Sequence, residues 1–246
     1  MALLTALLAA LSLFAPLLAS EAEGTLVPHT ATYKIKISIA SGRLKSNVQK
    51  TDTGFSVVSV IEPTGLANLF LRGTIEERAQ FEMGPHGVLP RYYSSNDQLT
   101  KGKPVQDFTF DWDGGLVGGT VNDEFYEYEL SDNMRDRVTI QYQLMHNFVS
   151  GIEIDEYRML DGDEVKDLTV TSLGTKEIKV PFGRFEAIGV QHQAAGSKRV
   201  STLWLAEELG YLPVLIEQHR KGKRTVRAVL TNYQPITEAA VSAASE

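Results

Sequence analysis

Apolar and polar side chains alternate with a period of two residues along most of the chain, and this pattern predicts β-strands. Residues 212–216 and 226–230 show it most clearly, on either side of a basic turn at 220–224 that has Gly222 at its centre. Two alternating stretches that flank a glycine turn predict an antiparallel hairpin. We therefore expect the C-terminal part of the chain to fold into paired strands.

Turn signals rich in glycine, aspartate and proline recur at the short spacing that is typical of β-sandwiches and barrels. They include 113–115, 161–163 and 181–183, and alternation resumes after each of them. No repeat of fixed period and no break in composition divides the chain. The pattern predicts one mainly β domain over residues 23–236, built as an antiparallel meander and followed by a flexible tail at 237–246.

One segment departs from the strand pattern. Residues from about 132 to 149 carry apolar side chains at helical spacing. Ser131 or Asp132 is suited to cap the start of a helix here, and Gly151 is suited to end it. We therefore expect a single α-helix that plugs or covers an open face of the sheet.

The N-terminal residues 2–18 are almost wholly apolar and lead into the small residues of 19–22, a pattern that a signal peptidase cleaves. We expect residues 1–22 to be a signal peptide, so that the protein acts in the periplasm and has no membrane span after cleavage. The apolar run is close to the shortest length that crosses a membrane. A retained anchor is therefore the alternative.

The chain has 246 residues, a formal net charge of −7 and no cysteine. An acidic total argues against nucleic acid as the main partner. Without cysteine, the chain offers no disulfide, no thiol nucleophile and no thiolate metal site. The motifs of nucleotide, phosphate and zinc sites and of serine hydrolases are missing too, so we predict no cofactor, no metal and no catalytic residue.

His192 and His219 both fall on predicted C-terminal strands, where they would face each other across a sheet if the register allowed it. Glu186 or Glu217 would then orient one of them, as acid–base chemistry or metal binding requires. No third ligand stands at a metal-binding spacing. A hydrolase with a dispersed site of this kind is the alternative to a binding protein.

Four segments together resemble a bacterial family. They are Trp204–Val214 with the basic tip that follows, Gly87–Tyr92, Phe108–Trp112 and Val180–Glu186. Their pattern is similar to domain-of-unknown-function family 3108, over about residues 33–233. The resemblance implies a secreted or periplasmic protein whose sheet forms an incomplete barrel or β-spiral around the helix, similar in outline to lipoprotein carriers. It implies no catalytic residue.

Aromatic residues alternate in several predicted strands. They would line a cavity for an apolar ligand if the barrel is incompletely filled. Ordinary core packing is the alternative. The candidate ligand-binding residues are Tyr92, Phe108, Phe110, Trp112, Trp204 and Tyr211.

Two basic turns, at 198–199 and 220–224, lie at the same end of the sheet if the C-terminal strands form an antiparallel meander. They would place a cluster of cations at one rim of an acidic protein, which suits an anionic partner such as a lipid or another cell-envelope component. Solubilisation of hairpin tips is the alternative. The rim residues are Lys198, Arg199, Arg220, Lys221, Lys223 and Arg224.

The sequence favours a non-catalytic periplasmic binding or envelope-maintenance protein, which would hold a lipid-like or other apolar ligand or an envelope protein partner. A purely structural envelope component is a further alternative beside the hydrolase. The oligomeric state is left open.

Overall fold

In the computed structural model, the described residues are 26–38, 40–84, 87–100, 102, 104–153 and 156–236. The expected signal peptide (1–22) and tail (237–246) lie outside them. The strands are β1 (His29–Ile37), β2 (Ala40–Lys50), β3 (Phe55–Pro63), β4 (Ile75–Gly84), β5 (Gly87–Asp97), β6 (Gln106–Asp111), β7 (Leu116–Val121), β8 (Glu124–Glu129), β9 (Met134–Asp136), β10 (Glu156–Leu160), β11 (Val165–Val180), β12 (Gly183–Ala194), β13 (Arg199–Ala206), β14 (Leu212–Arg220) and β15 (Lys223–Pro235). The helices are α1 (Ala67–Phe70), α2 (Thr139–Ser150) and the 3-10 helix η1 (Glu207–Leu209).

All these strands belong to one sheet, which the chain both enters and leaves at its centre. The strand order is β8-β7-β6-β5-β4-β3-β2-β1-β15-β14-β13-β12-β11-β10-β9, so β1 and β15 are neighbours and β8 and β9 are the edges. Neighbouring strands pair antiparallel except β9 and β10, which are parallel because α2 connects them. The predicted antiparallel meander is therefore confirmed, with this one exception.

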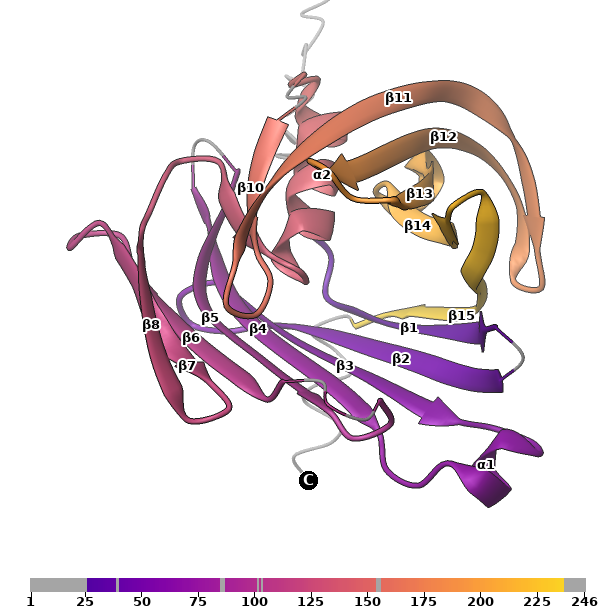
Figure 1. Cartoon of the computed structure of the whole chain (residues 1–246). Coiled ribbons are helices and arrows are strands. Elements are labelled where there is room, and N and C mark those ends of the chain that lie inside the picture. Colours follow the sequence, from indigo (N-terminus) through magenta and orange to yellow (C-terminus); the bar gives the residue numbers. More distant parts are fainter. Residues whose placement is uncertain are drawn as a thin grey trace, which may run out of the picture.

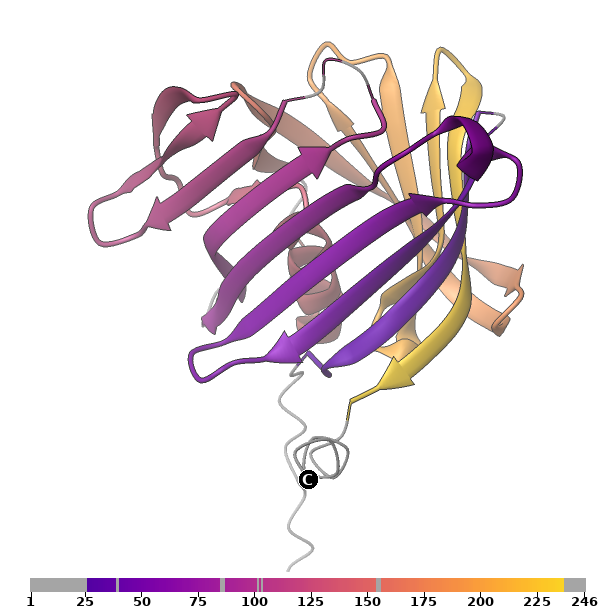
Figure 2. The same ribbon diagram turned by 90° about the horizontal axis from the view of Figure 1, so that it is seen from below.

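The sheet curls into an incomplete barrel, and α2 lies inside the curl (Figures 1 and 2). The edge strands β8 and β9 are not paired with each other, although only residues 130–133 separate them along the chain. A mainly β, open barrel-like sheet with one packed helix is the fold class that the sequence predicts. Among the described residues, no helix is long and apolar enough to cross a membrane.

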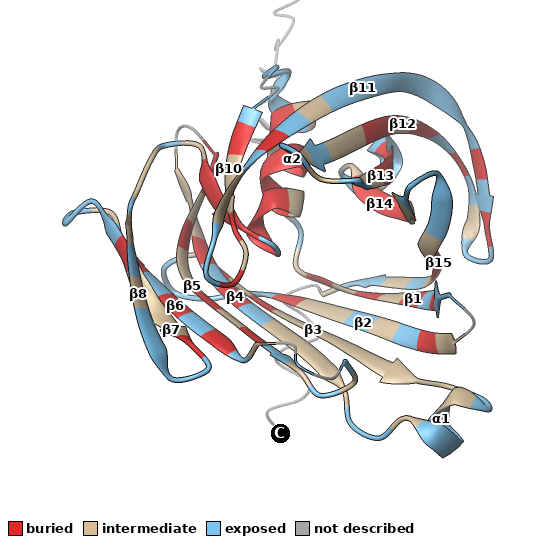
Figure 3. Cartoon of the chain, in the orientation of Figure 1, coloured by how far each residue is buried: buried red, intermediate tan, exposed pale blue. Residues whose placement is uncertain are grey.

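Alternation along the strands builds the main core. In β6, Phe108 and Phe110 are buried, while the residues that alternate with them are exposed. Phe81 of β4 stacks on Phe55 of β3 and on Tyr142 of α2, with ring centroids 5.7 and 5.3 Å apart. Side chains from both halves of the sheet and from the helix thus meet in one core. Figure 3 shows buried residues along both halves of the sheet and along α2. Each such aromatic side chain contributes about 1.5–3 kcal/mol by burial.

The helix α2 begins later than its apolar spacing indicates. The sequence predicts a helix over about 132–149, whereas α2 spans Thr139–Ser150. Residues Met134–Asp136 form β9 instead, and their backbone pairs with β10. The predicted start was therefore wrong by several residues. The predicted end was right, because Gly151 adopts the left-handed conformation with φ of 65°.

The Asp136 carboxylate fixes where α2 begins. Its Oδ1 accepts hydrogen bonds from the backbone N–H groups of Val138 and Thr139 at 2.8 and 2.9 Å. Thr139 Oγ1 donates to Asp136 Oδ2 at 2.6 Å and accepts from the Asp136 backbone N–H at 3.1 Å. This reciprocal pair satisfies donors that a helix start leaves open, so Ser131 and Asp132 do not cap the helix.

A buried polar network holds α2 against the sheet. Arg135 donates from Nε and Nη2 to Gln143 Oε1 at 3.0 and 2.7 Å, and the same oxygen accepts from the Val88 backbone N–H at 2.8 Å. Gln143 Nε2 donates to Asn147 Oδ1 at 2.7 Å, and Asn147 Nδ2 donates to the Tyr157 hydroxyl at 2.5 Å. Because unpaired buried polar groups are costly, this network fixes the helix relative to β5, β9 and β10.

Candidate functional site

A cleft of about 790 Å³ opens between α2, the β10–β11 turn, the β12–β13 turn and β14. These turns lie at one end of the sheet, because β10 ends there, β11 begins, β12 ends and β13 begins. The floor of the cleft is apolar. It is formed by Ile140 and Leu144 of α2, Leu168 of β11, Leu203 of β13 and Ile216 of β14.

The helix serves both the main core and the cleft because it is apolar on two sides. Tyr142 and Met145 belong to the main core, whereas Ile140 and Leu144 belong to a second cluster under the cleft. Residues four apart share one side of a helix, so Ile140 and Leu144 present a continuous apolar surface. The two-sided pattern explains why α2 is buried inside the curl.

Along strands β13 and β14, the residues that line the cleft change from apolar to cationic. Successive residues of one strand face opposite sides of the sheet, so every second residue reaches the cleft. The register pairs Leu203 with Ile216, Ser201 with Gln218 and Arg199 with Arg220, and all six residues line the cleft. The wall therefore has an apolar layer, a layer of hydroxyl and amide groups, and a layer of guanidinium groups at the end of the strands.

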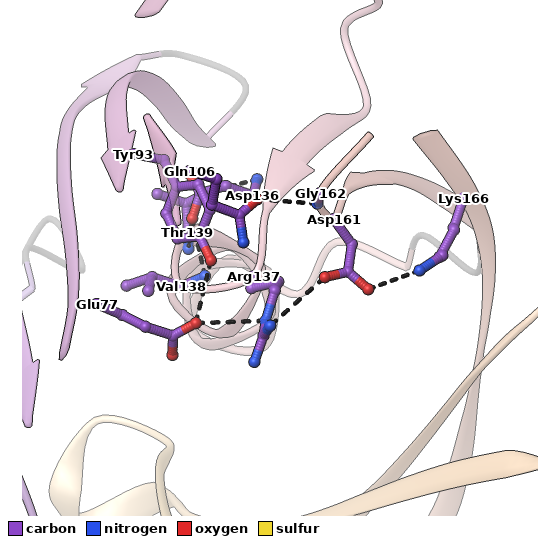
Figure 4. A network of polar contacts seen from close by, with 10 residues as sticks. All are labelled: Glu77, Tyr93, Gln106, Asp136, Arg137, Val138, Thr139, Asp161, Gly162 and Lys166. Atoms are coloured by element: carbon purple, nitrogen blue, oxygen red, sulfur yellow. Dashed lines mark hydrogen bonds and ion pairs between the residues drawn. The ribbon is translucent and has the colours of Figure 1, made fainter. Parts of the chain in front are cut away.

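An ion-pair network forms the opposite wall (Figure 4). Arg137 Nε lies 3.3 Å from Glu77 Oε1, and its Nη1 lies 3.5 Å from Asp161 Oδ1. Lys166 Nζ lies 2.7 Å from Asp161 Oδ2. The Glu77 charge raises the pKa of Arg137. Burial alone would lower the pKa of Lys166, but hydrogen bonds and charge from Asp161 and Glu164 raise it. Both cations are thus charged and already paired.

Three further cations line the cleft without such partners. Lys198, Arg199 and Arg220 form no ion pair with any described residue. They lie together because Arg199 is opposite Arg220 in the ladder and the Lys221 backbone N–H donates to the Lys198 carbonyl oxygen at 3.1 Å. The two basic turns of the predicted rim are therefore neighbours in space, and half of the rim borders the cleft.

The other half of the rim lies beyond the cleft. Lys221, Lys223 and Arg224 sit at the β14–β15 tip and are not among the lining residues. Arg224 Nη1 lies 3.0 Å from Glu217 Oε1, so its charge is already compensated. Lys221 and Lys223 form no ion pair with a described residue.

The two histidines that sequence analysis paired lie on opposite faces of the sheet. His192 is opposite Ser201 and His219 is opposite Val200, and these are consecutive residues of β13. Only His192 lines the cleft. Burial lowers its pKa to about 4, so its ring is neutral near pH 7. Within the described part of the chain, no group of three or more His, Asp or Glu side chains is placed to hold a metal ion.

None of the six aromatic candidates lines the cleft. Phe108 and Phe110 are buried in the main core. The Tyr92 hydroxyl donates to Asp107, and Trp112 Nε1 donates to the Pro90 carbonyl oxygen at 2.7 Å.

The last two aromatic candidates, Trp204 and Tyr211, belong to the part of the chain that forms the C-terminal half of the sheet. Lys176 Nζ lies 3.7 Å above the Trp204 ring. Tyr211 stacks on Phe148 of α2 with ring centroids 5.5 Å apart. Trp204 belongs to the main core together with Phe108 and Phe110, and Trp112 and Tyr211 pack against it. These five aromatic residues thus serve core packing.

Sequence reasoning missed the wall and the floor of the cleft. Arg137 falls inside the segment that was expected to be helix, and Asp161 and Lys166 belong to a turn and a strand with no motif. One signal was available, namely that Ile140 and Leu144 add a second apolar side to a helix already apolar at Tyr142 and Met145. A helix that is apolar on two sides needs two apolar surfaces to pack against.

Fold and cleft together define an open, β-barrel-like domain of uncharacterised function. The chain belongs to the family described as "Protein of unknown function (DUF3108)", whose model matches residues 29–229. This match confirms the family that the four sequence segments resemble. No curated protein matches the chain.

A solved structure supports the fold assignment. A β-barrel-like protein of domain of unknown function DUF1849 from Brucella abortus matches with a TM-score of 0.56 and 12% identity, covering 86% of this chain and 99% of that one. A putative exported protein with a YmcC-like fold from Bacteroides fragilis matches with a TM-score of 0.32 and 13% identity, covering 85% of this chain and 97% of that one. At such low identity, the first likeness shows the shared fold alone.

Proposed function

We propose that this protein is a non-catalytic binding protein whose cleft holds an amphipathic anion, with an acyl chain on the apolar floor and a carboxylate or phosphate at Arg199 and Arg220. The observation that carries the proposal is the graded wall of β13 and β14, from Leu203 and Ile216 to the two arginines. A ligand with one apolar and one anionic end matches both ends of that gradient.

The charge balance of the cleft supports an anionic ligand. Five cationic and two acidic side chains line it, an excess of three cations, while the whole chain has a formal net charge of −7. The excess equals the three cations without ion-pair partners, Lys198, Arg199 and Arg220. Arginine binds carboxylate and phosphate groups through two parallel hydrogen bonds, which gives such a site both affinity and orientation.

The size and floor of the cleft support an acyl chain. A volume of about 790 Å³ lies within the range of about 300–1,000 Å³ that small-molecule sites occupy. Floor residues such as Ile140, Leu144 and Leu203 offer no hydrogen bond to a polar ligand, so they favour an apolar group by burial.

The cell envelope is the compartment that we propose for this activity. The expected signal peptide would deliver the protein to the periplasm, where acyl lipids are abundant on both sides. The role would then be to hold or carry an acyl lipid, or its hydrolysis product, between envelope partners.

Geometry gives the hydrolase alternative little support. His192 is opposite Ser201 in the β12–β13 ladder, but among the described residues no hydrogen bond joins the two side chains. A histidine whose pKa is about 4 is a weak general base near pH 7. His219, the intended partner, lies on the other face of the sheet.

Native mass spectrometry of the protein purified from periplasm, before and after organic extraction, tests the proposal directly. We expect an additional lipid-sized mass that extraction removes. Extracted protein should then bind palmitate in isothermal titration calorimetry more tightly than it binds uncharged monopalmitoylglycerol. A clean polypeptide mass together with no palmitate binding would refute the proposal and favour a purely structural envelope role.

A matched pair of variants locates the ligand. The double variant R199Q/R220Q should weaken palmitate binding by about tenfold or more, since hydrogen bonds to charged groups contribute about 1.5–3 kcal/mol each. The control K221Q/K223Q removes the same charge from the neighbouring tip but leaves the cleft unchanged, and it should bind palmitate as the wild type does. Equal weakening by both pairs would show a non-specific charge effect instead.

A further inference from the structure

The loop between β3 and β4 exposes three large apolar side chains in one helical turn. Leu66, Leu69 and Phe70 are 78%, 71% and 83% exposed. No residue of α1 is buried, and the loop protrudes from the sheet as an exposed tip (Figures 1 and 3). Single exposed apolar residues are common, but a protruding cluster of three marks a contact surface. We call residues 64–74 the apolar loop.

Unpaired cations lie at the same end of the sheet as the apolar loop. The Thr64 backbone N–H donates to the Ser41 carbonyl oxygen at 2.9 Å, and the Ser38 backbone N–H donates to the Thr225 carbonyl oxygen at 2.9 Å. These bonds connect the apolar loop through the β1–β2 turn to the β14–β15 tip. Strands β3 and β15 are three positions apart in the sheet, which is roughly 14 Å at the usual spacing between strands.

Three cationic side chains at this end of the sheet are available to an anionic partner. Arg72 is exposed and lies two residues after the end of α1, and Lys221 and Lys223 occupy the β14–β15 tip. None of the three forms an ion pair with a described residue. The acid that precedes the loop, Glu62, is paired with Arg43 at 3.3 Å. One unpaired cation therefore lies within the apolar loop, and two more lie at the same end of the sheet.

A bilayer fits this surface better than a folded partner does. Stable protein interfaces bury about 800 Å² on each side and need a broad complementary surface, which a convex tip of three side chains does not offer. Leucine and phenylalanine that enter the headgroup region, with lysine and arginine beside them, are the pattern of proteins that bind anionic membrane surfaces. The cationic side chains would meet the phosphates while the apolar ones enter below them.

We propose that the apolar loop inserts into the interface of an anionic lipid bilayer, with Arg72, Lys221 and Lys223 on the headgroups. The cleft cations Lys198 and Arg220 adjoin the same β14–β15 tip, so docking would bring the cleft entrance next to the membrane. The inference goes beyond ligand binding in the cleft and does not depend on it.

Co-sedimentation with vesicles tests the docking surface. The purified protein should bind vesicles of phosphatidylcholine with about a third phosphatidylglycerol, and bind pure phosphatidylcholine vesicles far less. The variant L69S/F70S should lose about tenfold or more of the binding. The variant K221Q/K223Q should lose binding to the anionic vesicles only, and more so at low salt, where surface charge is least screened.

Two matched controls keep the test specific. Phe125→Ser removes an apolar side chain that is 66% exposed on the edge strand β8, away from the loop. K50Q/K179Q removes two exposed lysines from the opposite end of β2 and β11. Both controls should bind anionic vesicles as the wild type does. Circular dichroism and thermal unfolding would check that every variant folds.

A tryptophan in the loop reports insertion itself. In Phe70→Trp, brominated lipids should quench the new fluorescence and its emission should shift to the blue, whereas Phe125→Trp should show neither effect. Unchanged vesicle binding by L69S/F70S, or an unquenched Phe70→Trp, would overturn the proposal. Loss of a co-purifying protein from L69S/F70S without loss of vesicle binding would also overturn it, in favour of a protein partner. Palmitate binding by R199Q/R220Q is measured separately, so failure of the cleft leaves this result interpretable.

Discussion

Replacement of Gly87 by alanine should destabilise the protein far more than an ordinary glycine substitution. Gly87 has φ of +103°, where an L-residue is strained, and a Cβ there would lie only 2.8 Å from Cδ of Gln143. The backbone strain costs about 1–3 kcal/mol. Displacement of Gln143 also breaks its bonds to Arg135 and to the Val88 N–H, and buried bonds to a charged group contribute about 1.5–3 kcal/mol. We expect a total loss of about 3–6 kcal/mol.

Equilibrium unfolding in urea, followed by the fluorescence of Trp112 and Trp204, measures this loss. The matched control is Gly174→Ala, because Gly174 also has a positive φ, of +74°, but no atom lies within 4 Å of a Cβ placed there. This control should lose only the strain, about 1–3 kcal/mol.

A double-mutant cycle isolates the clash. Gln143→Ala alone should be strongly destabilising, because it leaves Arg135 and the Val88 N–H short of partners in the core. The double variant G87A/Q143A should cost much less than the sum of the single variants, by about 2 kcal/mol or more, because the clash no longer exists. Additivity within about 0.5 kcal/mol, or equal losses in Gly87→Ala and Gly174→Ala, would refute the account of the network.

The remaining predictions concern pH and packing. Burial lowers the pKa of His192 to about 4, so the stability that its neutral ring contributes is present above pH 6.5 and is lost as the pH falls towards 4. The free energy of unfolding of H192Q should therefore rise relative to that of the wild type, by up to about 3 kcal/mol, as the pH falls over that window. Burial raises the pKa of Asp136 to about 6, so the stability that its protonated form contributes is present below pH 3.8 and is lost as the pH rises through 6. The free energy of unfolding of D136N should therefore fall relative to that of the wild type as the pH falls from 6 to 3.8. Urea titrations at half-unit pH steps check both predictions. If the difference in free energy of unfolding between a variant and the wild type stays constant across its window, the prediction for that residue is contradicted. Phe108→Ala should cost about 3–5 kcal/mol because the side chain is fully buried, whereas Tyr92→Phe should cost under about 1 kcal/mol; equal midpoints in urea for the two variants would contradict the core placement of Phe108.

The strands and turns were predictable because their signals are local. Period-two alternation marked β14 and β15, and Gly222 and Gly151 marked a hairpin tip and a helix end by conformations that favour glycine. The signal that sets the start of α2 is not local. Residues 134–136 have helical spacing, but they pair with β10, which lies some twenty residues further on and whose position depends on the whole sheet.

The cleft was harder to predict than the fold for the same reason. Its rim could be placed from the order of the hairpins, which set Arg199 opposite Arg220. Its floor and second wall come from α2 and the β10–β11 turn, which meet only in the folded chain. The aromatic prediction took alternation in β6 as a sign of a cavity. Alternation shows only that one face of a strand is turned inward, and Phe108 fills the space that it faces.

The position of β1 beside β15 determines how the chain closes. Ladders within β1–β8 and within β9–β15 join strands that are close in sequence, so each half of the sheet can form early. The β1–β15 ladder joins the two ends of the domain, so it closes the largest loop of the sheet and costs the most loop-closure entropy. The Ile236 backbone N–H donates to the Pro28 carbonyl oxygen at 2.7 Å, so these ends already meet. A circular permutant that joins them and opens at 130–133 would make the order of strands in the sheet identical to their order in the chain, and every ladder would then be one between successive strands.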